Sequence, residues 1–152
     1  MSMSKLKLKP LPLGNARRPT KEERALLELI ERHVFYIRYR KVILSTDLAD
    51  LYEIESRVLI QTMRRNIDRF PDLFVFQLNA DEFSVLKSQF VISKYNKIQR
   101  SPPYAFSAQG VVMLATVLRN PRAIAINIAI VRAFVQPQHA YLRIRSVPPY
   151  LW

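Results

Sequence analysis

The sequence predicts an α+β fold: a small helix-turn-helix domain with short β-hairpin and wing strands, closed by two C-terminal helices. Three observations predict this class. Capping residues precede segments whose apolar side chains recur at helical spacing, short runs of β-branched and aromatic residues separate these segments, and two short helices are joined by a tight turn. The length of 152 residues fits one domain, and a hydrophobic fraction of 49% supplies an ordinary core.

Thr20 begins the first predicted helix. Its hydroxyl can accept a hydrogen bond from the amide of Glu23, whose carboxylate can reach back, so the two residues form a capping box. Apolar side chains then follow at helical spacing. The next run, residues 35–44, is β-branched and aromatic with basic residues in its middle, which predicts a short hairpin with a basic turn.

Residues 45–47 supply capping side chains for a second helix, which we expect over residues 47–52. The chain turns at residues 53–55, and a third helix follows over about residues 56–69. It stops at Phe70 because a proline comes next. Two short helices joined by such a turn are the signature of a helix-turn-helix motif.

The second half of the domain alternates strands and helices. Residues 74–78 predict a strand, and Asn79 caps a helix over residues 80–90. The basic stretch 91–100 and the short run 104–106 together predict a β-wing.

Two further helices are expected to close the domain. Ser107 caps one that runs to about Leu118. Asn120 and Pro121 begin the other, which ends near Val135, because proline is favoured at the first helical position.

We therefore divide the chain into a basic disordered arm (1–19), a folded domain (20–136) and an irregular C-terminal tail (137–152). A short amphipathic membrane anchor is the alternative for the arm, but Pro10 and Pro12 argue against a helix there.

The net charge of +12 is unevenly distributed along the chain. Residues 1–19 carry +5, residues 20–82 carry −2, and residues 83–152 carry +9 without a single acidic residue. Soluble surfaces usually intersperse both signs, so this excess indicates an anionic partner: nucleic acid, a membrane surface or an acidic protein.

The third helix separates apolar from basic side chains when residues 56–70 are placed on a helical wheel. Its apolar face comprises Leu59, Ile60, Met63, Ile67 and Phe70. Its opposite face comprises Arg57, Gln61, Arg64, Arg65 and Asp68. Arginine pairs with guanine and glutamine with adenine in the major groove, which admits an α-helix, so duplex DNA is the expected partner. The groove contacts we expect come from Arg57, Gln61, Arg64 and Arg65.

Other basic residues are expected to contact phosphates, which position a protein without reading sequence. The candidates for these backbone contacts are Arg38, Arg40, Lys41, Arg69, Lys94, Lys97 and Arg100, with the basic arm.

The last helix is apolar around more than half of its surface. One interpretation is a central core helix. The other is a homodimer interface through residues 121–135, which would let two third helices reach half-sites one DNA turn apart. Asn127, inside the apolar arc, either satisfies a buried backbone group or fixes register across a dimer.

Several runs of sequence match a known family in order and at family spacing. They are Val42–Tyr52, Arg65–Phe74, Ser88–Phe90, Pro103–Val111 and Ala123–Val135. These runs resemble the ORF6N domain, a phage and bacterial antirepressor-type N-terminal domain related to KilA-N and Bro-N, over about residues 28–136. The resemblance implies sequence-specific double-stranded DNA binding in the control of a prophage or mobile element. The chain departs from it in having a short tail in place of an effector domain, and Arg38-Tyr39-Arg40 where the family hairpin often has glycine.

No catalytic, cofactor or metal site is expected. His33 and His139 have no acidic or cysteine neighbours at ligand spacing and are interpreted as surface or hydrogen-bonded histidines. The serines lack the glycines of a nucleophile elbow, and Gly110 permits close packing more readily than it binds phosphate. The chain contains no cysteine and no apolar stretch long enough to span a membrane, so we expect an intracellular protein. The resemblance to the ORF6N domain implies a location in the bacterial cytoplasm, in association with the nucleoid.

Two other functions remain open. One is an antirepressor that binds a repressor through its apolar last helix, with DNA contact secondary. The other is single-stranded RNA binding, with Tyr36, Tyr39 and Tyr95 as stacking groups.

Overall fold

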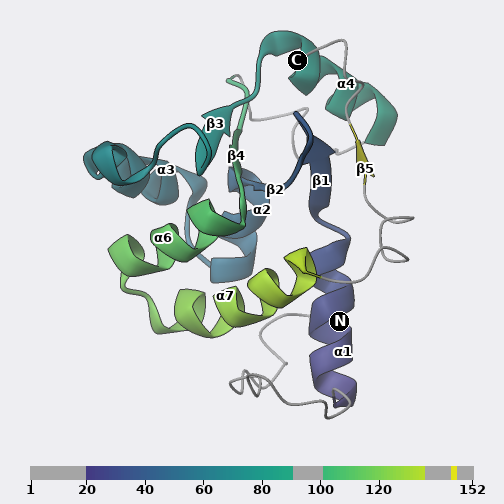
Figure 1. Cartoon of the computed structure of the whole chain (residues 1–152), viewed down its shortest axis with the longest axis vertical. Helices are drawn as coiled ribbons and strands as arrows, with labels where there is room; N and C mark the ends of the chain where they lie inside the picture. Colours follow the sequence, from purple (N-terminus) through teal and green to yellow (C-terminus); the bar gives the residue numbers. More distant parts are fainter. Residues whose placement is uncertain (1–19, 91–100, 136–144, 147–152) are drawn as a thin grey trace.

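Figure 1 shows the computed structural model, which describes residues 20–90, 101–135 and 145–146. The helices are α1 (Lys21–Glu31), α2 (Ser45–Tyr52), α3 (Ser56–Arg65), α4 (Ala80–Phe90), α6 (Ala108–Leu118) and α7 (Pro121–Phe134). The strands are β1 (Val34–Ile37), β2 (Arg40–Leu44), β3 (Val75–Gln77), β4 (Tyr104–Phe106) and β5 (Arg145–Ser146). The expected α+β class, with a hairpin and two helices after β4, is confirmed.

The strands form one sheet in the order β3-β4-β2-β1-β5. β1 and β2 are the expected hairpin, paired Phe35 to Val42 and Ile37 to Arg40. β4 joins β2 to β3 by antiparallel pairing on both sides, whereas β5 runs parallel to β1. Within the segment 137–152, interpreted from the sequence as irregular, the described residues 145–146 form a short strand.

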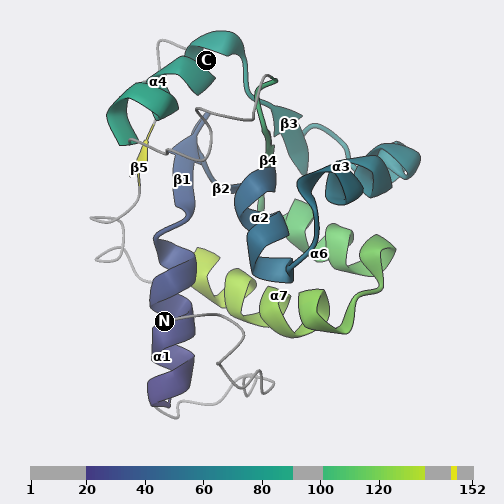
Figure 2. The same cartoon turned by 180° about the vertical axis from the view of Figure 1, so that it is seen from behind.

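The sheet separates two hydrophobic clusters because successive side chains of a strand point to opposite faces. One face carries Val34, Ile43, Val75 and Phe106, which pack with α1, α2, α3, α6 and α7 in the larger cluster. The other face carries Phe35, Ile37, Val42, Leu44 and Ala105, which pack with α4. In Figures 1 and 2, α4 accordingly lies above the strands, and α1, α6 and α7 lie below them.

Four predicted helix starts are confirmed by their side-chain hydrogen bonds. Thr20 and Glu23 form the capping box, with Thr20 Oγ1 accepting from the Glu23 amide at 3.1 Å. Asn79 Oδ1 accepts from the Glu82 amide at 2.7 Å, and Ser107 and Asn120 cap α6 and α7. Each cap satisfies amides that the first helical turn leaves without an intrahelical partner.

The predicted cap of the second helix is wrong. Helix α2 begins at Ser45, its cap residue is Leu44, and no side chain caps it. Ser45 is buried, and its hydroxyl accepts a hydrogen bond from the amide of Tyr104 at 3.1 Å. Its hydroxyl therefore ties the start of α2 to β4.

The third helix is shorter than predicted. α3 ends at Arg65, and a single 3₁₀ turn, Ile67–Arg69, follows Asn66. The change of helical period turns Ile67 away from the apolar face, so its side chain is 56% exposed. Phe70 is buried as expected and packs edge-on against Phe106.

The hairpin turn has an unusual backbone. Arg38 and Tyr39 both have positive φ values, 53° and 63°, as a two-residue type I′ turn requires. Glycine, asparagine and aspartate are the usual residues at such positions, so the turn holds two bulky side chains in a left-handed conformation.

Helix α7 is mostly a core helix. It packs on α1, α2 and α6, and its buried side chains include Ile126, Ile130 and Phe134. Asn127 is also buried: its Nδ2 donates to the Val111 carbonyl oxygen at 2.8 Å, and its Oδ1 accepts from the Tyr52 hydroxyl. The interpretation of Asn127 as satisfying a buried backbone group is confirmed.

Gly110 permits close packing, as expected from the sequence. A Cβ atom built there would lie 2.9 Å from the carbonyl carbon of Phe74 and closer still to its oxygen. The backbone of α6 therefore reaches the residue that precedes β3 only because position 110 has no side chain.

Candidate nucleic-acid interface

Helix α3 is anchored to the domain by one face. Leu59 and Met63 are completely buried, and α3 packs against α2 and α6. Glu53, whose φ of 58° ends α2 in the left-handed conformation, begins the turn between α2 and α3. Arg122 of α7 binds this turn, with its Nε 3.2 Å from the Leu51 carbonyl oxygen and 3.4 Å from Glu53 Oε2. The orientation of α3 is thus determined by buried contacts.

The opposite face of α3 is open to solvent. Arg57, Gln61, Arg64 and Arg65, the four expected groove residues, are all exposed. Their spacing of three, four and seven residues places them along one stripe of the helix. Figures 1 and 2 show α3 at one flank of the molecule, on the side away from α1 and β5.

Val58 also lies on the open face of α3, and the helical wheel had not singled it out. Its side chain is 41% exposed between Arg57 and Gln61. The signal was present in the sequence, because residue 58 lies three and seven positions before Gln61 and Arg65 on the helix.

Two of the four groove residues make contacts within the chain. Arg64 Nη2 donates to the Tyr104 hydroxyl at 2.9 Å, and its guanidinium lies 5.7 Å from the centre of that ring. Arg57 Nη2 lies 3.2 Å from Glu55 Oε2, and both side chains are largely exposed. Within the described part of the chain, the side chains of Gln61 and Arg65 have no hydrogen bond or ion pair.

Arg38, an expected phosphate contact, is held inside the domain. Its Nε and Nη2 donate to the two carboxylate oxygens of Glu82 at 3.0 and 2.9 Å, and Glu82 is completely buried. The guanidinium also lies 4.2 Å from the centre of the Phe76 ring. This two-pronged ion pair joins the hairpin turn to the start of α4.

Arg40 and Lys41 also make contacts within the chain. Arg40 Nη1 donates to the Asp72 carbonyl oxygen at 3.1 Å, and its guanidinium lies 5.3 Å from the Phe76 ring centre. Lys41 Nζ donates to the Phe134 carbonyl oxygen at 2.8 Å. Arg38, Arg40 and Lys41 are therefore engaged within the domain. The structure does not add them to the exposed basic side chains of α3.

Arg69, by contrast, is exposed on the 3₁₀ turn that directly follows α3. The remaining expected phosphate contacts, Lys94, Lys97, Arg100 and the basic arm, lie outside the described residues, as does the wing stretch 91–100. Among the expected phosphate contacts that the structure describes, Arg69 is thus the one that is exposed next to the expected major-groove residues of α3.

His33 is the described histidine of the chain, and it lies beside an acidic side chain. His33 Nδ1 lies 3.3 Å from Asp47 Oδ1, which agrees with the interpretation of His33 as a hydrogen-bonded histidine. His139 lies outside the described residues. Among the residues that the structure describes, no cluster of three metal-ligating side chains occurs, and no helix is long and apolar enough to cross a membrane.

Comparison with known proteins agrees with the resemblance drawn from the sequence. No curated protein and no solved structure matches the chain. The ORF6N domain matches residues 32–117, more than half of the 152 residues. This range runs from the residue that caps the end of α1 almost to the end of α6, and it includes the hairpin, α2, α3 and β4. The chain belongs to the ORF6N domain family.

Proposed function

We propose that this protein binds double-stranded DNA in a sequence-specific manner, with α3 in the major groove. The observation that carries the proposal is the open face of α3, on which Arg57, Gln61, Arg64 and Arg65 lie outward while Leu59 and Met63 anchor the other face in the core. A helix held in this way presents its base-reading side chains at little conformational cost, because the scaffold already determines its direction.

The chemistry of this face suits base edges. Arginine can donate two hydrogen bonds to guanine, and glutamine can exchange two with adenine. Val58 adds an apolar surface of the kind that contacts the thymine methyl group. Gln61 and Arg65 need not break any contact within the described chain before they bind, and Arg64 is already oriented by Tyr104.

Phosphate contacts would supply much of the affinity. Arg69 adjoins the groove candidates, and residues 1–19 and 83–152 together carry +14. We place the protein in the bacterial cytoplasm, associated with the nucleoid, as a transcriptional regulator or antirepressor of a prophage or mobile element. In this proposal it acts by binding and catalyses no reaction.

A homodimer through residues 121–135 would have to use the exposed remainder of α7. Ile124 and Val135 are the large apolar side chains still exposed there, because the other isoleucine, valine and phenylalanine side chains of that range are buried or half-buried within the chain. Sedimentation at micromolar concentration, with and without DNA, measures whether two copies associate.

The test begins with selection of bound duplexes from a random pool, which identifies a preferred site. Replacing Arg64 and Arg65 together by alanine should weaken binding to that site by about tenfold or more, since each good base contact contributes about 1–3 kcal/mol. The matched control replaces Arg24 and Arg32, two exposed arginines of α1 and its C-terminal cap, and has the same net charge. Equal affinity of the two double variants would show that the wrong face had been assigned.

Salt dependence separates this proposal from its rivals. DNA binding through about six phosphate contacts should weaken by about a thousandfold between 50 and 200 mM salt, whereas an apolar protein interface should respond little. Competition by single-stranded RNA measures the remaining alternative. Of its three stacking candidates, Tyr39 is more exposed than Tyr36, and Tyr95 lies outside the described residues.

A further inference from the structure

Two hollows on the surface of α6 open beside each other. The first, which we call the basic hollow, has a volume of about 410 Å³ and is lined by Arg40, Lys41, Leu73, Phe134, Val135 and the start of α6. The second, the apolar hollow, has a volume of about 490 Å³ and is lined by Phe74, Val112, Met113 and Thr116. Ala108 and Gln109 line both hollows, so the two adjoin, and we call them together the groove.

The groove gathers apolar side chains that the domain leaves uncovered. Leu73 is 68% exposed, Val112 is 50% exposed and Val135 is 74% exposed. Leu73 and Val135 border the basic hollow, and Val112 borders the apolar hollow. Large apolar side chains exposed close to one another mark an interaction site more often than single scattered ones do.

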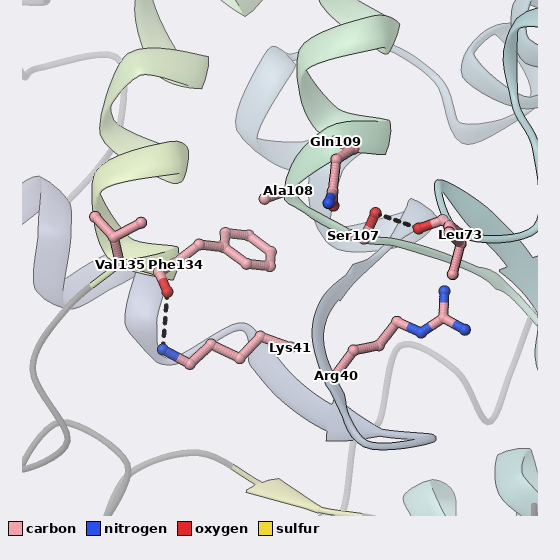
Figure 3. Close-up of a pocket in the computed structure, with 8 residues that line it drawn as sticks. All are labelled: Arg40, Lys41, Leu73, Ser107, Ala108, Gln109, Phe134 and Val135. Carbon is pink, nitrogen blue, oxygen red and sulfur yellow. Dashed lines mark hydrogen bonds between the residues drawn. The ribbon is translucent and has the colours of Figure 1, made fainter.

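The basic hollow adds positive charge at one end of the groove. Figure 3 shows Arg40 beside Leu73 on one side and Lys41 reaching across to the carbonyl oxygen of Phe134 on the other. The Arg40 contact is to the Asp72 carbonyl oxygen, which leaves the charge of its guanidinium in place. No acidic residue is among those that line either hollow.

We propose that this groove is a docking site for a segment of a partner protein that carries carboxylates next to large apolar side chains. The apolar side chains would fill the apolar hollow and cover Val112, and a carboxylate would lie against Arg40 in the basic hollow. Charge complementarity selects this occupant, because the lining offers positive charge and apolar surface together.

Other occupants match the groove less well. A nucleic acid supplies phosphates but has no large apolar side chains for the surface around Val112. The chain's own residues 136–152 contain no acidic residue, so they lack the group that Arg40 would bind. A second copy of the chain carries a net charge of +12, which opposes self-association at a basic hollow.

The residues that line the two hollows include neither the groove candidates of α3 nor Arg69. Arg40 and Lys41 do line the basic hollow, but the structure directs both to contacts with carbonyl oxygens of the domain. The proposal therefore does not depend on the proposed function, and different variants test the two.

The test selects random peptides of about 12 residues for binding to the full chain. Peptides of this length can present the spaced anchor residues of a helix that lies in a groove. We expect the enriched peptides to combine aspartate or glutamate with leucine, isoleucine, phenylalanine or methionine. The most enriched peptide, labelled with fluorescein, is then titrated with the full chain and its variants.

Val112→Asp should weaken binding of that peptide by more than about tenfold, because it places a charge against buried apolar side chains. Arg40→Gln should weaken it by about three- to tenfold by removing one cation. Ile124→Asp and Arg24→Gln make the same chemical changes at exposed positions of α7 and α1 and should leave affinity unchanged. Val112 is a surface residue, so its variant keeps the test valid even if Arg40→Gln proves unstable.

Several results would overturn the proposal. They are a selection that enriches no peptide, one that enriches peptides without acidic residues, and one whose peptides bind Val112→Asp as tightly as they bind the parent. A loss of self-association in Val112→Asp would make the groove an interface between copies, and a loss of duplex affinity in that variant would make it part of the DNA-binding surface. Loss of DNA binding in the Arg64 and Arg65 variant, with peptide binding intact, is the expected pattern if both proposals hold.

Discussion

Replacing Gly110 by alanine tests whether α6 reaches the start of β3 only because position 110 has no side chain. The added methyl group would lie 2.9 Å from the Phe74 carbonyl carbon, closer still to its oxygen, and 3.3 Å from Phe106 Cδ1. The first two atoms belong to backbone, so a side-chain rotation cannot relieve the contact. Either α6 or the segment at Phe74 has to move.

The size of the effect follows from what that movement disturbs. The Phe74 carbonyl oxygen accepts hydrogen bonds from the Ser107 amide at 3.0 Å and from the Ser107 hydroxyl at 3.3 Å, and Ser107 also caps α6. Overpacking costs about 1–3 kcal/mol, and a weakened cap and hydrogen bonds cost about 1–2 kcal/mol more. Alanine recovers about 1 kcal/mol of helix propensity. We expect a net loss of about 1–4 kcal/mol.

Urea unfolding followed by circular dichroism measures this loss. The control is Gln109→Ala, which adds the same residue at the exposed neighbouring position and should change stability by less than about 0.5 kcal/mol. A Gly110→Ala protein as stable as the parent, or more stable, would refute the reasoning, because helix propensity would then outweigh the contact.

The other predictions concern buried polar groups. Tyr52→Phe should lower the free energy of unfolding by about 1–3 kcal/mol, since the buried Asn127 Oδ1 loses the hydroxyl that donates to it. Burial raises the pKa of Tyr52 above the ordinary value of 10.0, so the folded protein keeps this proton after the unfolded chain has lost it. The parent should therefore lose up to about 1.4 kcal/mol of stability per pH unit above about pH 10 relative to Tyr52→Phe, and parallel stability–pH curves would contradict this. Glu82→Gln should lower the free energy of unfolding, measured with urea, by about 2–3 kcal/mol because it breaks the ion pair with Arg38. The loss is smaller than for a fully buried pair, since the Arg38 side chain is 31% exposed. The control is Asp81→Asn, which makes a similar change at an exposed position.

The local parts of the fold could be predicted from the sequence. Thr20, Asn79, Ser107 and Asn120 each bond to an amide two or three residues along the chain, so their roles are visible in a short window. The same holds for the hairpin, whose β-branched and aromatic residues flank a short turn.

The contacts of the basic hairpin residues could not be predicted in this way. Arg38 binds Glu82, 44 residues away, and Lys41 binds the carbonyl oxygen of Phe134, 93 residues away. Only the pairing of the sheet and the packing of α7 bring these groups together. A count of cations along the sequence therefore overstates how many are available to phosphates.

The exposed and buried faces of α3 could be predicted from the sequence, because both depend on the period of a single helix. Leu59 and Met63 are buried and Arg57 and Arg65 exposed, as helical period requires. Ile67 was placed on the wrong face because the change to 3₁₀ geometry after Asn66 leaves no strong signal in the residue types. The contact between Arg64 and Tyr104 joins residues 40 positions apart and depends on the sheet.

The parallel pairing of β5 with β1 has a consequence for solubility. β1 would otherwise be the outer strand of the sheet, and its unpaired amide and carbonyl groups would invite strands of other molecules. Arg145 and Ser146 occupy part of that edge opposite Phe35 and Tyr36. A chain shortened after α7 would keep every described member of both hydrophobic clusters but uncover this edge, and it should aggregate at concentrations where the full chain stays dispersed.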